Sequence, residues 1–169
     1  MKRSIQLKAP GVVLTSVAKE DVEELRLWKN EARATFFYKK EISQEEQENW
    51  YRGYLTRDDD QLFSVQRDGR RAGFIGVRMK SNDTEVYAVI ARPQPEGRRL
   101  LGPALRLAAT YAAAGGVARV FCRILKDDSI RDWFIAEGFR VAAEKADHVE
   151  LEPDPARFRP LRYEYNAVG

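Results

Sequence analysis

The sequence predicts one α/β domain over residues 1–169, with a mixed, mostly antiparallel central sheet and helices on both faces. Three observations favour this fold class. Apolar residues recur at helical spacing in several separate segments. Three strand-like runs in the middle of the chain follow one another through short turns, as in an antiparallel meander. A later strand–helix–strand order requires a parallel crossover, which makes the sheet mixed.

The N-terminal part reads as one strand followed by two helices. A strand is expected over 11–17, and a helix over 19–32, where apolar residues recur every three or four positions. A second helix opens at Ser43, because Glu46 three residues later completes a capping-box pattern. These helices precede the meander.

The remaining elements follow from alternation, turns and glycine stops. The DGR and SND turns separate the three strands of the meander, and the glycine pair at 115–116 ends a long Ala- and Leu-rich helix. The expected elements are strands over 61–68, 71–80 and 84–92, a helix over 97–116, a strand over 118–125, a helix over 127–139, and final strands over 139–145 and 160–168.

Composition excludes several classes of protein. The chain has one cysteine and one histidine, so neither an internal disulfide nor a four-ligand zinc site of the usual Cys/His type is expected. The net charge of +3 is spread among acidic residues, which does not indicate a nucleic-acid surface. No signal peptide or membrane span is expected. We therefore expect a cytoplasmic monomer or homodimer whose partners are small molecules.

The segment between the third meander strand and the long helix carries the clearest chemical signal. A helix N-terminus offers free N–H groups and a positive dipole end, an arrangement that binds phosphates. Gly97 permits close approach, and Arg92, Arg98 and Arg99 add charge suited to a pyrophosphate. On these grounds alone, an ordinary strand-to-helix turn with solvated arginines remains an alternative.

The run Gln94-Pro95-Glu96-Gly97-Arg98-Arg99 resembles the acyl-CoA loop of the GNAT acyltransferases, Gln/Arg-x-x-Gly-x-Gly/Ala. The segment SIRDWFIAEGF resembles the family's following helix and its closing Gly-Phe. The run over 25–51 resembles the acceptor-side helices of the branch that acetylates nucleotide-linked amino sugars or ribosomal proteins. The resemblance covers roughly 11–145. It implies acetyl-CoA or another acyl-CoA as cofactor, bound by Ala91, Gln94, Gly97, Arg98, Arg99, Gly102, Lys126 and Phe134.

Three positions depart from the family pattern. Arg99 stands where Gly or Ala is usual, and Lys126 or Asp127, depending on register, stands where Asn is frequent. The family's tyrosine general acid falls at Trp133 or Phe134. Such a ring can pack a pantetheine arm but has no hydroxyl to protonate a departing thiolate.

The resemblance implies a general base at Glu85, on the strand that leads to the loop. Strand alternation would place Tyr87 and Val89 on the same face, and Tyr87 could replace the missing acid. The backbone N–H of Ala91 would meet the oxyanion where this strand splays from its neighbour. For Glu85 and Tyr87, a solvated edge and core packing are the respective structural alternatives.

Acceptor binding is expected at Trp28, Asn30, Arg33 and Tyr38, which with Phe37 could hold a nucleotide base or a sugar diphosphate. These residues could equally be core and salt bridge. The resulting hypothesis is acetyl transfer to a primary amine, preferably an amino sugar on a nucleotide carrier. Modification of a protein amine, and a GNAT-shaped binding module without activity, stay open as alternatives.

Overall fold

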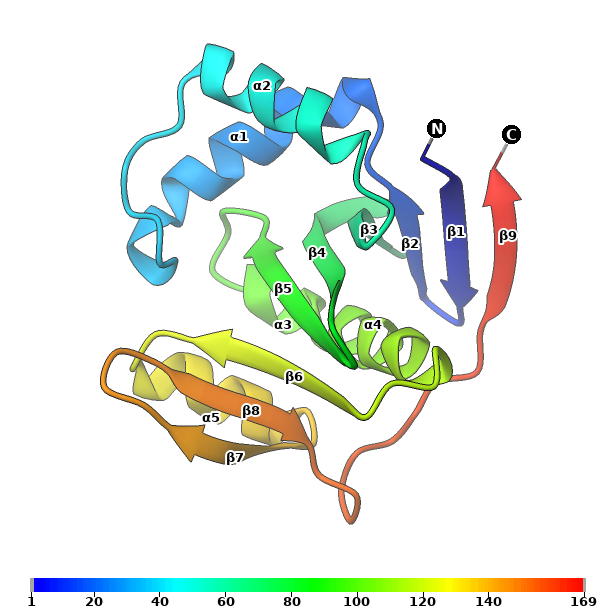
Figure 1. Cartoon of the computed structure of the whole chain (residues 1–169), viewed down its shortest axis with the longest axis vertical. Coiled ribbons are helices and arrows are strands. Elements are labelled where there is room, and N and C mark those ends of the chain that lie inside the picture. The colour runs from blue at the N-terminus through cyan, green and yellow to red at the C-terminus, as the bar shows by residue number, and fades with distance from the viewer. Residues whose placement is uncertain (1, 169) are drawn as a thin grey trace.

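The computed structural model describes residues 2–168, which fold into one sheet flanked by helices (Figure 1). The sheet has nine strands in the order β7-β8-β6-β5-β4-β3-β2-β1-β9. The strands are β1 (Ser4–Ala9), β2 (Val12–Ser16), β3 (Asp60–Arg67), β4 (Arg70–Lys80), β5 (Asp83–Ala91), β6 (Arg119–Ile124), β7 (Phe139–Glu144), β8 (Val149–Pro153) and β9 (Glu164–Val168). The α-helices are α1 (Val22–Glu31), α2 (Gln44–Tyr54), α3 (Gly97–Leu100), α4 (Gly102–Ala114) and α5 (Asp128–Ala136).

Two cores lie on opposite faces of the sheet. The larger one packs α4 and α5 against one face, through side chains such as Leu105, Phe134 and Val86. The smaller one packs α1 and α2 against the other face, through Leu25 and Tyr54 among others. Helices therefore cover both faces, as the sequence predicts.

β5 and β6 form the parallel pair of the otherwise antiparallel sheet. Their pairing covers Asp83–Glu85 against Arg119–Phe121 and then ends, although both strands continue. Beyond Glu85 the two strands share no ladder, so backbone groups and side chains along their facing edges become available to a ligand.

A β-bulge interrupts β5 directly after this point. Gly76 pairs with Tyr87 and Phe74 with Ile90, so Ala88 and Val89 together oppose the single residue between them on β4. Ala88 takes the left-handed φ of +51° that such an extra residue can require. The expectation that Val89 shares a face with Glu85 and Tyr87 is therefore wrong: Val89 packs on the α4 side.

The long helix expected over 97–116 is divided into α3 and α4 at Leu101. Pro103 lies in the first turn of α4, where it lacks the N–H that would continue the helical ladder. A strand that the sequence analysis did not identify, β1, pairs with β2. Another, β8, lies between β6 and β7.

The helix ends follow the sequence more closely. Ser43 caps α2 by accepting a hydrogen bond from the Glu46 N–H at 3.1 Å, and Asp127 caps α5 through the Ile130 N–H at 3.0 Å.

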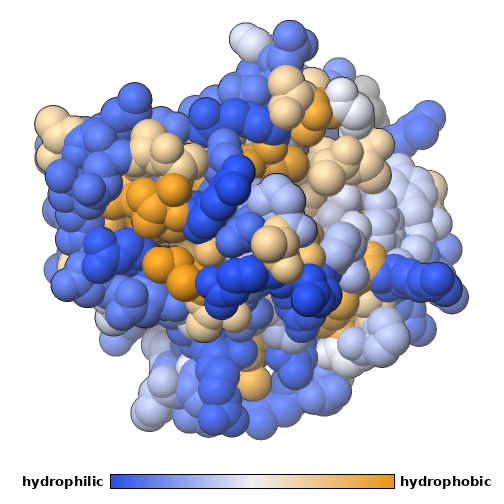
Figure 2. All heavy atoms as spheres, turned by 90° about the horizontal axis from the view of Figure 1, so that it is seen from below, coloured by the Kyte–Doolittle hydropathy of each residue, from blue (hydrophilic) through white to orange (hydrophobic). Residues whose placement is uncertain are grey.

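No helix within residues 2–168 is both long and apolar enough to cross a membrane. Figure 2 shows a mostly hydrophilic surface with scattered hydrophobic patches on the side seen from below.

Candidate active site

A cavity of about 800 Å³ opens where β5 and β6 diverge. It passes from the α1 side of the sheet to the α4 side, because the bulge at Ala88 turns the two halves of β5 to different faces. The α1 side, here the acceptor side, is lined by Lys29, Phe36, Phe37, Tyr38, Arg78, Glu85, Tyr87 and Arg123. The α4 side, here the donor side, is lined by Ala91, Arg92, Gln94, Arg98, Ile130, Trp133 and Phe134.

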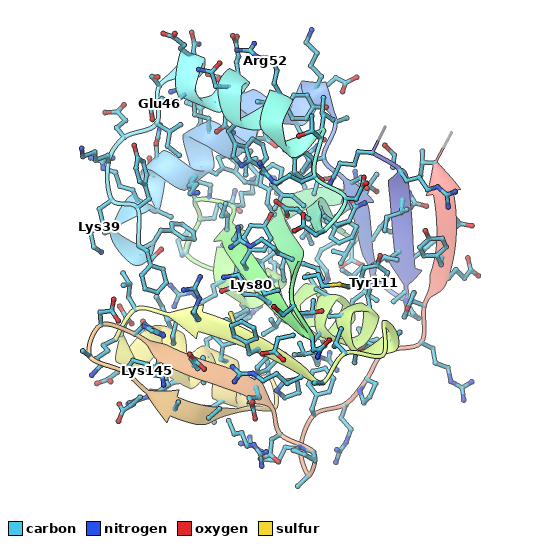
Figure 3. The ribbon with its side chains drawn as sticks, in the orientation of Figure 1. Lys39, Glu46, Arg52, Lys80, Tyr111 and Lys145 are labelled. Carbon is cyan, nitrogen blue, oxygen red and sulfur yellow. The ribbon has the colours of Figure 1, made fainter. Side chains whose placement is uncertain are left out.

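Glu85 lies at the junction of the two sides and is only 3% exposed. Its carboxylate accepts a hydrogen bond from Arg123 Nε at 2.7 Å and from Arg78 Nη2 at 3.1 Å. Lys80 Nζ lies 3.1 Å from the same carboxylate, and Figure 3 shows Lys80 near the centre of the molecule. One buried anion thus holds three cations.

These contacts determine the protonation state of Glu85. Burial is the largest single influence and raises its pKa, but hydrogen bonds from Arg123, Arg78 and Lys80 together bring the pKa below its ordinary value. A carboxylate with a lowered pKa holds a proton poorly, so it is a weak general base near neutral pH. The role of Glu85 as general base stays a prediction, and its contacts with three cations also suit a residue that positions Arg78 and Arg123.

Lys29 contributes a further positive charge to the acceptor side. Its ammonium forms no ion pair with any residue in the 2–168 range, and lies 5.7 Å from the centre of the Phe36 ring. Burial, and next the nearby Arg78 charge, lower the pKa of Lys29. Together with Arg78 and Arg123, it gives this side a cationic surplus that Glu85 offsets only in part.

Tyr87 lines the cavity, but its hydroxyl is already engaged. It donates a hydrogen bond to the carboxylate of Asp60, which is 1% exposed, while the Tyr87 ring covers Gly76 and lies under Arg78. Burial and the neighbouring Asp60 raise the pKa of Tyr87. A phenol held in this way releases its proton less readily, which disfavours Tyr87 as the general acid.

The loop after β5 brings Gln94 and Arg98 into the cavity wall. Gly97 does not line the cavity. A Cβ at this position would lie 2.1 Å from the Arg92 carbonyl oxygen, so glycine is required by contact within the loop itself. Arg99 is exposed and is not part of the cavity lining.

Two other expected cofactor residues also lie outside the cavity lining. Gly102 is buried against Glu137, whose carboxylate oxygen would lie 2.4 Å from an added Cβ. Lys126 is exposed at the start of the α5 cap. By contrast, Phe134 and its neighbour Trp133 both line the donor side, and the buried Trp133 Nε1–H has no hydrogen-bond partner within the described chain.

The backbone of Ala91 faces the opening between the strands. The Arg92 N–H donates to the carbonyl of Ala72, on the neighbouring strand β4, at 2.9 Å. Because N–H groups alternate along a strand, the Ala91 N–H is directed the other way, toward β6. This is the position that an oxyanion donor requires.

The expected acceptor residues divide into core and cavity. Trp28 packs edge-on against Phe74 with ring centres 5.6 Å apart, in the smaller core. Asn30, 8% exposed, donates to the Ile42 carbonyl at 3.0 Å and accepts from the Ile42 N–H at 2.7 Å. Both are structural residues, because their polar or aromatic groups are already used by the protein.

Arg33 and Tyr38 lie in the loop that Asn30 anchors. Arg33 is exposed, donates to the Asn30 carbonyl at 3.0 Å and does not line the cavity. Tyr38 does line it, with its hydroxyl donating to Glu46 at 3.2 Å. Of the expected acceptor residues, Tyr38 and its neighbour Phe37 reach the cavity lining within residues 2–168.

Several cationic residues of the acceptor wall carry no local signal in the sequence. Arg78 and Arg123 come from strands paired on either side of β5, so only the sheet register reveals that they meet Glu85. Lys29 lies one position from the expected Trp28 and Asn30, but on another side of α1. In the sequence, these residues appear only as cationic residues in strands or helices. That pattern is too common to indicate a binding site.

The one cysteine and the one histidine both lie near this site. Cys122 is buried and forms part of the cavity wall on β6. The His148 side chain is only 17% exposed: its Nδ1 lies 2.7 Å from Asp147 and its ring packs edge-on to Phe37. It therefore supports the acceptor wall from behind.

The family model described as "Acetyltransferase (GNAT) domain" matches residues 12–130. No curated protein sequence matches the chain. Among solved structures, FdhC, a nucleotide-linked sugar GNAT in its apo form, is similar at 16% identity with a TM-score of 0.68, over 86% of this chain and 88% of that one.

Two further structures are similar in fold. Spermidine N-acetyltransferase from Vibrio cholerae, solved with CoA and spermine, shares 10% identity over 94% of this chain and 96% of that one, with a TM-score of 0.69. A domain from Methanocaldococcus jannaschii shares 18% identity over 83% and 97%, also with a TM-score of 0.69. The fold, the divergent β5–β6 pair and the matched model agree: this chain belongs to the GNAT acetyltransferase domain family.

Proposed function

We propose that this protein transfers an acetyl group from acetyl-CoA to a primary amine on a small anionic acceptor, of which a nucleotide-linked amino sugar is the preferred example. The observation that carries the choice of acceptor is the cationic surplus of Lys29, Arg78 and Arg123 on the acceptor side. A diphosphate complements that charge. A polyamine would bring like charges together there.

The donor side fits a CoA-type group by its own chemistry. The Trp133 Nε1–H is a buried donor without a partner in the part of the chain that the structure describes. It suits an amide carbonyl, and Phe134 adds an apolar surface beside it. Arg92 and Arg98 supply positive charge at the loop for phosphates. When bound, acetyl-CoA would supply the activated thioester whose carbonyl the amine attacks.

Deprotonation of the amine follows from the electrostatics of the acceptor side. An ammonium placed beside Lys29 and Arg78 is destabilised by the burial and positive charge that already lower the pKa of Lys29. The neutral, nucleophilic form is thereby favoured without a strong general base. Glu85 then acts as a positioning residue that holds Arg78 and Arg123 in place, and the Ala91 N–H faces the developing oxyanion.

The first experiment is titration calorimetry of the purified chain with acetyl-CoA and with free CoA, followed by thiol release with a panel of amines. We expect micromolar acetyl-CoA binding and turnover with a nucleoside-diphosphate amino sugar. Acetyl-CoA binding with turnover only on spermidine or on an N-terminal peptide would contradict the acceptor class. Absence of acetyl-CoA binding would instead favour a GNAT-shaped binding module.

A further inference from the structure

A second, smaller cavity lies on the α4 face of the sheet, away from the acceptor side of the active site. Its volume is about 250 Å³, room for about eight water-sized groups. It is open to solvent and is bordered by the ends of β3 to β5, the C-terminal turn of α4 and the segment that leads into β9. The lining residues are Asp58, Asp59, Gln61, Val77, Met79, Thr84, Tyr111, Ala112, Ala114, Gly115 and Tyr163.

The charge of this cavity is opposite to that of the acceptor side. Asp58 and Asp59 line it, and no lysine or arginine does within the described chain. Lys2 and Arg57 lie nearby: Lys2 donates to the backbone carbonyls of Arg57 and Asp60, and Arg57 pairs with the Asp60 carboxylate on the other side of the sheet. Lys2 also interacts through its charge with Asp58 and Asp59, so it offsets part of their charge. The cavity ends at Gly115, where the negative end of the α4 dipole favours a cation.

An unsatisfied group points independently to a polar ligand. Thr84, in the cavity wall, is 2% exposed, and its hydroxyl has no hydrogen-bond partner among residues 2–168. A buried hydroxyl without a partner is costly, and the hydroxyl can accept a hydrogen bond from an N–H donor. Tyr111, labelled in Figure 3, and Tyr163 add aromatic rings 6.4 Å apart, which stabilise cations through their faces.

We propose that this cavity is a second binding site that takes a small organic ammonium ion. The Asp58 and Asp59 carboxylates supply the charge, the Thr84 hydroxyl accepts from the ammonium, and Val77, Tyr111 and Tyr163 contact its apolar part. The site does not depend on the proposed acceptor chemistry, since it lies on the other face of the sheet and shares no lining residue with the larger cavity.

The probe is butylammonium, with butan-1-ol as the neutral control of matched size and butyrate as the anionic one. Binding to the full-length 15N-labelled chain is followed by backbone amide shifts of Thr84 and Gly115. We expect butylammonium to bind in the millimolar range, at least about tenfold more tightly than butan-1-ol. Saturating acetyl-CoA should leave these shifts in place.

The variants separate charge from the hydroxyl. Asp58→Asn combined with Asp59→Asn should weaken butylammonium binding on the order of tenfold, whereas Asp132→Asn, an exposed control on α5, should leave it unchanged. Thr84→Val should weaken binding several-fold yet stabilise the free chain, because it removes an unsatisfied hydroxyl. Equal binding of alcohol and ammonium, displacement by acetyl-CoA, or no shift at about 10 mM probe would overturn the proposal.

Discussion

Arg123, two residues beyond the last paired residue of β6, donates its Nε–H at 2.7 Å to Glu85, the last paired residue of β5. The contact spans the point where the sheet divides. It ties the divergent strands together at the base of the cavity while leaving their outer parts separate. The Glu85 side chain therefore lies both at the centre of the charged cluster and at the point where β5 and β6 separate.

Replacing Glu85 tests its role as a positioning residue. Glu85→Gln leaves three cations without their anion, so we expect the free energy of unfolding to fall by about 1–3 kcal/mol, given that the cations are a third exposed. The acceptor KM should rise, while acetyl-CoA affinity by calorimetry stays within a few-fold. A kcat loss of about 10–1000-fold with unchanged KM would identify Glu85 as the base instead.

Glu85 also makes stability depend on pH. Its folded pKa lies below the unfolded value of about 4.3, so the unfolded chain binds the proton first as pH falls. The stabilisation is complete above that value and is lost as pH drops through the folded pKa. Urea unfolding should show the gap between wild type and Glu85→Gln narrowing below about pH 4. A gap that stays constant down to pH 3 would contradict the lowered pKa.

Lys29 should control the pH dependence of turnover. Lys29→Met removes a positive charge beside the bound amine, so the rising limb of kcat against pH, which reports groups in the substrate complex, should move to higher pH by roughly one unit. Lys29→Arg, which keeps the charge, should leave the limb in place. If Lys29→Met lowers the rate equally at every pH, the electrostatic effect on the amine is absent.

Gly97 tests the loop contact on the donor side. Gly97→Ala places a Cβ 2.1 Å from the Arg92 carbonyl oxygen. Because this oxygen belongs to the backbone, the clash can be relieved only by moving the loop itself. We expect a loss of about 1–3 kcal/mol in stability and at least tenfold weaker acetyl-CoA binding, measured by urea unfolding and calorimetry. Gly53→Ala, in α2, meets only the flexible end of Arg57 and should be neutral or stabilising. Equal effects of the two changes would contradict the contact.

Asn30 tests whether the acceptor loop acts through its anchor. Asn30→Ala removes both hydrogen bonds to Ile42, so we expect a loss of about 1–3 kcal/mol and a higher acceptor KM with acetyl-CoA binding unchanged. Asn30→Asp retains an acceptor for the Ile42 N–H but sets a carboxylate against the Ile42 carbonyl. It should recover stability only in part. An unchanged KM in Asn30→Ala would separate the loop from acceptor binding.

The order of the main elements could be predicted from sequence because each carries a local signal. Ser43 and Glu46 mark a helix start, and the turns of the meander mark strand ends. β1 is hard to predict: Ile5 and Leu7 alternate with polar residues, but the flanking lysines and Pro10 weaken the strand pattern. β8 was missed because it is short and carries Glu150 and Glu152, whose partners are on neighbouring strands.

The candidate site was less predictable, since it depends on residues brought together by the fold. Gln94 and Arg98 follow from the loop pattern, and the structure places both in the cavity wall. Asn30 looked like a ligand because an amide near aromatics suits a nucleotide, yet its partner is backbone twelve residues away. Arg78 and Arg123 carry no local signal, because only the pairing of β4 and β6 with β5 brings them to Glu85.

The extra residue at Ala88 shifts the alternation of side chains along β5 by one position. Before it, the odd-numbered residues Glu85 and Tyr87 lie on the α1 side of the sheet, whereas the odd-numbered residues Val89 and Ala91 after it lie on the α4 side. One strand therefore supplies residues to both ends of the same cavity, and a substitution at Glu85 or Tyr87 does not alter the face that carries Val89 and Ala91.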